Sequence, residues 1–234
     1  MILSVHQPNF LPWIGYFHKI IQSDIFVMLD TVQVPRGKSV ANRNKIKTSG
    51  GAFELVVPLS FPSGSERISS YREVLIADKS WKVKALKTLG QNYARAEYFD
   101  QIHPFITECF DQNGFFEMNH FFIHSILKEF GIEDRLVLLS ALETNDERNN
   151  QLILNICKKL GADTYLSGKG AASYNDPEMY KTMGVALTYQ EYEPITYKQL
   201  HGTFIPNLSM LDMLYNLGFQ TSFELLNHSA TAQP

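Results

Sequence analysis

The sequence predicts an α/β protein with a Rossmann-like, mostly parallel sheet, flanking helices and a helical insertion in the middle of the chain. Short apolar runs alternate with helix-like segments near both ends of the chain. This order is typical of β-α-β units, which require parallel strands. Three helical segments follow one another between these two halves. We therefore expect a single α/β domain over residues 1–234, with residues 80–131 as a helical insertion or subdomain.

The first β-α-β unit begins almost at the initiator methionine. The apolar run MILSV ends at Pro8 and predicts a buried strand. Pro8 and Pro12 prevent the next residues from being helical throughout, and Gly15 permits a tight turn or a close approach. YFHKIIQSD then has helical spacing, and DIFVMLDTV predicts the second strand, with Asp30 near its carboxyl end.

The middle of the chain opens with a polar, basic and turn-rich segment, QVPRGKSVANRNKIKTSGG. The next run, FELVVPLSF, predicts a strand that can form a hairpin with this segment. A shorter strand is expected in SGSERISSYREVLIAD. The helical segments of the insertion are SWKVKALKTLGQNYARA, FDQIHPFITECFDQ and MNHFFIHSILKEFG.

The last part of the chain again alternates strands and helices. The predicted strands are RLVLLSAL, DTYLSG and VALTYQEYEP. The predicted helices are NDERNNQLILNICKKLGA, PEMYKTMG and FIPNLSMLDMLYNLG. The first of these is expected to have Asn145 or Asp146 as its N-cap and Gly161 just past its end. We expect the tail NHSATAQP to be frayed.

The composition limits where the protein is expected to be located and what it is expected to bind. With 44% hydrophobic residues the chain can bury a sizeable core. Its net charge of −3 argues against DNA binding driven by an overall positive charge. Neither a signal peptide nor a transmembrane run of ~18 apolar residues is evident, so a cytoplasmic protein is expected. Cys109 and Cys157 are interpreted as buried, reduced thiols.

Three unusual segments fall at the predicted carboxyl ends of strands, where parallel sheets bind ligands. The first contains His6, Gln7 and Asn9, and it leads into the start of a helix, which favours an anion. The other expected site residues of this segment are Trp13, Gly15, Tyr16 and Lys19. The alternative is that His6 caps the strand and that the aromatic residues belong to the core.

The second segment contains Asp30 and the basic run behind it. Asp30 is a candidate to bind a ribose hydroxyl, a metal or an amine, or else to cap a turn. The run includes Lys38, Asn42, Arg43 and Asn44, which would hold phosphate groups if they lie beside the site. Its alternative is a solvated loop.

The third segment, SGKGAASY, is rich in small residues. Backbone N–H groups around Ser167, Gly168 and Gly170 can form an anion-binding nest, and Tyr174 can stack on a ring. The alternative is a tight turn before a helix.

A metal site and hydrolase chemistry find no support in the sequence. His120 and His124 share a helix face, but a third metal ligand is not evident, so we expect a core or surface role for them. No GxSxG motif occurs.

The chain resembles the WbqC-like protein family along most of its length. The resemblance is carried by HQPNFLPWIGYFHKI, NRNKI, NDERNNQLILNICKKLGADTYLSGKGAASY and YKQLHGTFIPNLSMLDMLYNLG. It implies a role in bacterial surface-polysaccharide biosynthesis of the O-antigen (lipopolysaccharide) type, with transfer of glycine or another acyl group onto an amino sugar. The positions that match the family pattern are His6, Gln7, Pro8, Pro12, Gly15, Lys19, Asn42, Arg43, Asn44, Arg148, Ser167, Gly168, Gly170, Tyr174, Phe204, Pro206, Ser209, Asp212 and Asn216.

A more distant similarity links the start of the chain to the HxGH nucleotidylyltransferases. LPWIGY would occupy the HxGH place, with Trp13 and Tyr16 in place of both histidines, which weighs against adenylyl transfer. One branch of that superfamily joins a carboxylate to an amine through an acyl-adenylate. Such a route would use ATP with Mg²⁺, and the sequence leaves the need for either open.

Two classes of function follow from these observations. The first is an acyl or aminoacyl transferase, or an amide-forming enzyme, acting on a nucleotide-linked amino sugar with a small acyl or amino-acid donor. Its expected catalytic residues are His6, Lys19 and Asp30. The second is a noncatalytic nucleotide-sugar-binding or scaffold protein of the same pathway. Helices rich in phenylalanine, methionine and leucine also allow a homodimer.

Overall fold

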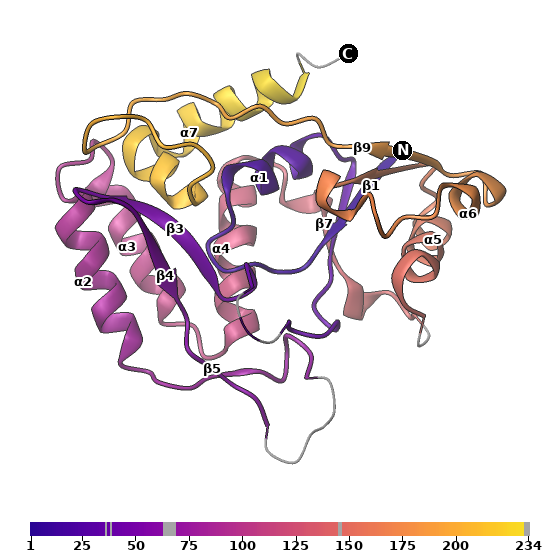
Figure 1. The fold of residues 1–234 in the computed structure, drawn as a ribbon, viewed down its shortest axis with the longest axis horizontal. Helices are drawn as coiled ribbons and strands as arrows, with labels where there is room; N and C mark the ends of the chain where they lie inside the picture. The colour runs from indigo at the N-terminus through magenta and orange to yellow at the C-terminus, as the bar shows by residue number, and fades with distance from the viewer. Residues whose placement is uncertain (36, 38, 63–68, 145–146, 232–234) are drawn as a thin grey trace.

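A five-stranded parallel sheet forms the centre of the fold (Figure 1). The computed structural model describes residues 1–35, 37, 39–62, 69–144 and 147–231. The strands of this sheet are β1 (Ile2–His6), β2 (Ile25–Met28), β7 (Leu136–Leu138), β8 (Thr164–Ser167) and β9 (Ala186–Tyr189). The Rossmann-like, parallel α/β class predicted from the sequence is thereby confirmed.

The strand order is β7-β2-β1-β8-β9, so the chain winds outward from β1 in two opposite directions. Residues Leu3–His6 pair in register with Ile25–Met28, and Leu3 also pairs with Tyr165 on β8. The order therefore reverses between β1 and β8, which is the topological switch point of the sheet. Ligands of open parallel sheets bind beyond the carboxyl ends of the strands at such a point.

Two apolar layers cover the two faces of the sheet. Leu3 and Val27 pack under α5 (Asn149–Leu160) and α6 (Pro177–Thr182). Phe26 lies on the other face, within the larger core that includes α1 (Ile14–Ile21). Figure 1 shows α5 and α6 on one side of the sheet and α1, α4 and α7 on the other. The alternation follows from the period of two in a strand.

The predicted helical insertion in the middle of the chain is present as three consecutive helices. They are α2 (Trp81–Tyr93), α3 (Phe99–Phe110) and α4 (Phe115–Glu129). An antiparallel hairpin of β3 (Arg43–Thr48) and β4 (Gly51–Val56) precedes them, followed by the short pair β5 (Leu59–Ser60) and β6 (Leu75–Ile76).

The ends of two helices differ from their prediction. α5 begins at Asn149 with Arg148 as its N-cap, so the N-cap prediction is wrong; Asn145 and Asp146 lie outside the described residues. Gly161 does end this helix, in the left-handed conformation with φ 70°.

The final helix, α7 (Met210–Thr231), starts later and ends later than the sequence predicts. It is kinked at Gly218, where φ is 70° and ψ is −178°. A Cβ at this position would lie 2.6 Å from the Tyr98 ring. The predicted fraying of NHSATAQP is wrong for residues 227–231, which continue α7 beyond the fully buried Leu226, and residues 232–234 lie outside the described residues. None of the helices in the described part of the chain combines the length and apolar character needed to cross a bilayer.

A buried carboxylate ties α7 to the rest of the fold. Asp212 is inaccessible to solvent and accepts hydrogen bonds from the hydroxyls of Tyr93 at 2.6 Å and Tyr197 at 2.7 Å. The Tyr93 oxygen in turn accepts from the backbone N–H of Lys47 on β3. Burial raises the pKa of Asp212, and the hydroxyl donors and the nearby Lys47 charge oppose that rise. These bonds join α2, β3, the segment before α7 and α7 itself.

The Asp212 network predicts a selective loss of stability. Tyr197→Phe removes one of two donors to a buried carboxylate, so the free energy of unfolding should fall by ~1.5–3 kcal/mol. Tyr174→Phe is the matched control because Tyr174 is 78% exposed. Urea denaturation at pH 7 measures both variants. Equal changes in the two variants would show that the network contributes nothing specific.

Candidate functional site

Polar side chains from five parts of the chain converge at the carboxyl ends of β1 and β2. We call this group the strand-end cluster. Its members are His6, Gln7, Lys19, Asp30, Tyr71, Arg72 and His120. Of these, the sequence predicted His6, Gln7, Lys19 and Asp30.

His6 is the last residue of β1 and is half-buried. Its Nδ1 lies 3.0 Å from the backbone oxygen of Gln7. Because a carbonyl oxygen only accepts, Nδ1 carries the hydrogen and Nε2 is left as an acceptor. Burial, followed by the charge of Lys19, lowers the pKa of His6 to about 3. The imidazole is therefore neutral at pH 7.

Lys19 reaches the same strand end from α1. Its side chain is almost fully buried, and Nζ donates a hydrogen bond to the backbone oxygen of Val5 at 3.0 Å. Burial lowers the pKa of Lys19 to about 7. A neutral amine is therefore accessible at this position near neutral pH, and a neutral amine can accept a proton.

Two tyrosines hold Gln7 in place. The hydroxyl of Tyr16 donates to the Gln7 backbone oxygen at 3.2 Å, and the hydroxyl of Tyr71 donates to Oε1 of the Gln7 side chain at 3.3 Å. Tyr71 stacks on Phe115 at the start of α4, with ring centroids 5.9 Å apart. Burial raises the pKa of both tyrosines, so both remain protonated donors.

Asp30 is fully buried just beyond β2, and both of its oxygens are occupied. Nε of Arg72 donates to Oδ2, and the backbone N–H of Ser140 donates to Oδ1 at 2.9 Å. Nη2 of Arg72 donates to the Ser140 hydroxyl at 3.0 Å. In this arrangement the carboxylate of Asp30 orients an arginine.

Helix α4 covers the cluster from the insertion. The Arg72 guanidinium lies over the ring of Phe116, at 4.5 Å from its centroid, and the ring of His120 lies 5.5 Å from the same ring. Asn119 donates to the backbone oxygen of Pro8 at 3.0 Å. Burial lowers the pKa of His120, and the charges of His124 and Arg72 lower it further. No group of His, Cys, Asp and Glu side chains that could hold a metal ion occurs among the described residues.

Sequence reasoning missed three members of the cluster. Tyr71 and Arg72 lie in a segment without a local motif, and only their distant partners mark them. The spacing of His120 and His124 was visible, but their position beside Arg72 depends on how the insertion packs.

The rest of the first predicted segment is tightly packed. Asn9 is buried, and Trp13 packs edge-on against Tyr192 with centroids 5.2 Å apart. A Cβ at Gly15 would lie 2.3 Å from the Trp13 ring, so this position requires glycine. Nε2 of Gln190 donates to the Gly15 backbone oxygen at 2.8 Å.

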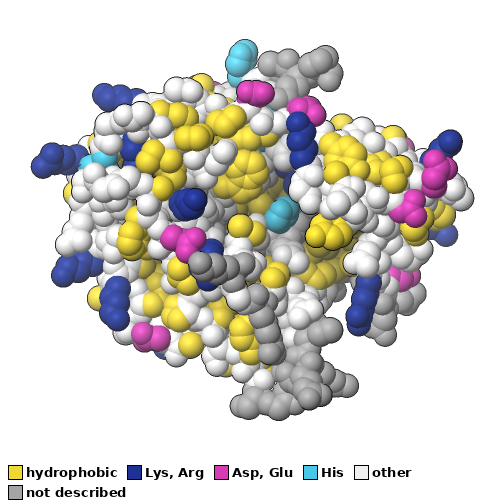
Figure 2. All heavy atoms as spheres, viewed as in Figure 1, with side chains coloured by type: hydrophobic (Ala, Val, Ile, Leu, Met, Phe, Trp, Pro, Cys, Tyr) yellow, Lys and Arg dark blue, Asp and Glu magenta, His cyan; other side chains and the backbone are white. Residues whose placement is uncertain are grey.

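The polar side chains of the basic run hold backbone in place. Nδ2 of Asn44 donates to the backbone oxygen of Leu11 at 2.6 Å, and Nδ2 of Asn42 to that of Val57 at 2.9 Å. Arg43 pairs with Glu54 across the hairpin at 2.9 Å. Lys38 lies outside the described residues. Figure 2 shows the lysine and arginine side chains of this face scattered, mostly toward its rim.

The third predicted segment begins at the end of β8, beside β1. Ser167 is fully buried, and its hydroxyl accepts from Nδ2 of Asn175 at 2.9 Å. Gly168 and Gly170 lie in the turn that follows, and Tyr174 is exposed. The first and third segments therefore lie at neighbouring strand ends.

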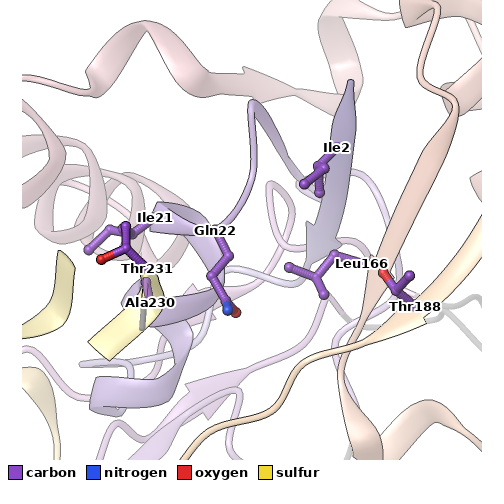
Figure 3. Close-up of a pocket in the computed structure, with 7 residues that line it drawn as sticks. All are labelled: Ile2, Ile21, Gln22, Leu166, Thr188, Ala230 and Thr231. Carbon is purple, nitrogen blue, oxygen red and sulfur yellow. The ribbon is translucent and has the colours of Figure 1, made fainter. Parts of the chain in front are cut away.

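A separate pocket of about 360 Å³ lies away from the strand-end cluster (Figure 3). It lies between the sheet and the ends of α1 and α7, and it reaches Ile2 at the amino end of β1. Its lining residues are Ile2, Ile21, Gln22, Leu166, Thr188, Ala230 and Thr231. This lining offers no charged side chain for catalysis.

Comparison with known proteins gives two matches. The family model described as the WbqC-like protein family matches residues 7–223. The chain is 30% identical to the uncharacterized protein Rv1507c of Mycobacterium tuberculosis over 220 residues, which cover 92% of this chain and 94% of that protein. The family match spans the strand-end cluster except His6.

The lowered pKa of Lys19 predicts a dependence of stability on pH. The folded pKa of about 7 lies below the ordinary value of 10.5, so the unfolded chain binds more protons between these values. The unfolding free energy of the wild type, minus that of Lys19→Met, should therefore rise with pH from 7 toward 10, by up to ~1.4 kcal/mol per pH unit.

Urea denaturation at three pH values in this window measures the difference. Lys87→Met, at an exposed position of α2, is the control and should show no such slope. A Lys19→Met difference that stays flat with pH would mean that Lys19 remains charged in the folded protein.

Proposed function

The chain belongs to the WbqC-like protein family, and we propose that it is an enzyme of bacterial surface-polysaccharide biosynthesis that forms an amide on a nucleotide-linked amino sugar. The transferred group is an acyl or aminoacyl group of the glycine type. The observation that carries this proposal is the buried Lys19, whose pKa is about 7 and whose Nζ bonds to Val5, the residue before the neutral His6 at the end of β1. Groups that titrate near the working pH are suited to proton transfer.

In the proposed reaction the amine of the sugar attacks the carbonyl carbon of an activated acyl donor. A C–N bond forms, and the bond between the acyl carbon and its leaving group breaks, with the electron pair departing on the leaving group. The attacking nitrogen must lose one proton. Lys19 in its neutral form accepts that proton, and Nε2 of the more exposed His6 accepts a hydrogen bond from the amine and orients it.

The nucleotide part of the substrate is assigned to the switch point between β1 and β8. Its diphosphate would meet backbone N–H groups at Gly168 and Gly170, just beyond the buried Ser167, and the exposed Tyr174 would stack on a ring. Asn42, Arg43 and Asn44 would support the binding loop, since Asn44 already holds Leu11.

The proposal predicts that turnover depends on both residues. His6→Ala and Lys19→Met should each lower kcat/KM by ~10²–10⁴ for amide formation. In the wild type the rate should rise with pH through about 7, as Lys19 loses its proton, and this rise should disappear in Lys19→Met. His228→Ala, at an exposed position of α7, is the matched control and should retain full activity.

The assay detects the amide product by mass spectrometry, after a thermal-shift screen of nucleotide-linked amino sugars has chosen the acceptor. Unchanged turnover in His6→Ala would exclude a catalytic role for His6. Strong binding of the sugar without any product, across thioester, acyl-phosphate and acyl-adenylate donors, would instead favour a noncatalytic binding protein.

A further inference from the structure

Arg72 is fixed in one orientation by three contacts. Nε donates to the buried carboxylate of Asp30, and Nη2 donates to the hydroxyl of Ser140. The flat face of the guanidinium rests on Phe116, with Cζ at 4.5 Å from the ring centroid. The side chain is nevertheless 41% exposed, so solvent and small ligands can reach it.

The contacts leave part of the guanidinium unused. Nη1 of Arg72 has no hydrogen-bond partner within the described ranges of the chain. An arginine that served only Asp30 would normally present two parallel N–H groups to its carboxylate. Here one N–H goes to the carboxylate and another to a hydroxyl, and Nη1 stays available with its two N–H groups.

Two histidines of α4 lie near Arg72, and the charge of Arg72 acts on the first of them, His120. His120 packs on the same Phe116 ring as Arg72, and His124 packs on His120 with centroids 5.4 Å apart. The ring nitrogens of His120 make no hydrogen bond to other described residues. Both histidines would donate N–H groups when protonated.

We propose that Arg72, together with His120 and His124, forms a subsite that binds an oxyanion, either a phosphate or a carboxylate group of a small molecule. A guanidinium with an open, pre-oriented edge matches the geometry of both groups. None of these three residues was among the binding residues predicted from the sequence. The proposal concerns binding alone, so it does not depend on which reaction the protein catalyses.

The subsite and His6 belong to adjacent strand ends. Tyr71, the neighbour of Arg72 in the chain, bonds to Gln7, and the backbone N–H of Leu29 donates to the oxygen of His6 at 2.9 Å. A ligand anchored at Arg72 by its anionic group can therefore extend toward His6. The anion would serve to place the reacting part of the molecule.

The local charges imply that binding takes up a proton. Asp30 offsets the charge of Arg72, and Glu117 adds a negative charge near His120. A neutral His120, which burial favours by lowering its pKa, would leave little positive charge for an anion, whereas a protonated His120 would supply it. Affinity for sulfate, which does not titrate between pH 6 and 8, should therefore be higher at pH 6.

The test is calorimetric titration of the full-length protein with pyrophosphate and, separately, malonate. Arg72→Lys keeps the positive charge but removes the planar guanidinium with its paired N–H groups, so it should weaken binding at least ~10-fold. His120→Gln should weaken binding ~3–10-fold and reduce the pH dependence of sulfate binding. Arg95→Gln, at an exposed arginine near the end of α2, is the matched control and should bind as the wild type does.

The two ligands separate the two sources of the anion, because a phosphate subsite prefers pyrophosphate and a carboxylate subsite prefers malonate. His120→Gln keeps the test valid if the Arg72 variant is unstable, since His120 makes no bond to Asp30. The proposal is overturned if the wild type binds neither ligand, or if Arg72→Lys and His120→Gln both bind as tightly as Arg95→Gln.

Discussion

The strand-end cluster depends on one ion pair, between the buried carboxylate of Asp30 and the partly exposed Arg72. A carboxylate with no solvent exposure is costly unless it is paired and hydrogen-bonded. Arg72 and the backbone N–H of Ser140 meet that requirement, and they come from segments 42 and 110 residues away in the chain. Satisfying Asp30 therefore fixes the segment of Arg72 over the ends of β1 and β2. The same segment brings Tyr71 to Gln7, the neighbour of His6, so the ion pair also positions the hydroxyl that holds the Gln7 side chain.

A second buried carboxylate, Asp212, performs the corresponding task for the other half of the core. It joins α7 to the helical insertion and the hairpin through Tyr93 and to the preceding segment through Tyr197. With α7 and the insertion held together, α4 can place Phe116 and Asn119 against the strand ends. The insertion is thus a wall of the candidate site, in addition to being a source of apolar burial.

A feature could be predicted from the sequence where it depends on neighbouring residues, and it could not where it depends on contacts between distant segments. The strands were predictable because apolar runs are local signals, and His6 and Lys19 stood out because they flank the first strand end. Strand order was not predictable, since the pairing of β1 with β8 joins residues far apart in the chain. Arg72 carried no local signal at all. The polar tail was predicted to fray, but α7 continues through it to Thr231, beyond the kink at Gly218 and the buried Leu226, and no local pattern indicates that.

Lys47 and Lys19 are both buried, but they differ in how well their side-chain nitrogens are hydrogen-bonded. Lys47 is 1% exposed, and its ammonium donates to Gln199, Gly202 and Thr203, which matches its three N–H groups. Lys19 is 4% exposed and has one acceptor, Val5, among the described residues. One acceptor can hold a neutral amine, but it leaves two N–H groups of an ammonium without a hydrogen-bond partner. A methionine would fill the same space without the free-energy cost of burying an amine. A buried amine that is poorly satisfied when charged is held partly in its neutral form, and only the neutral form has the lone pair that a proton acceptor or nucleophile needs.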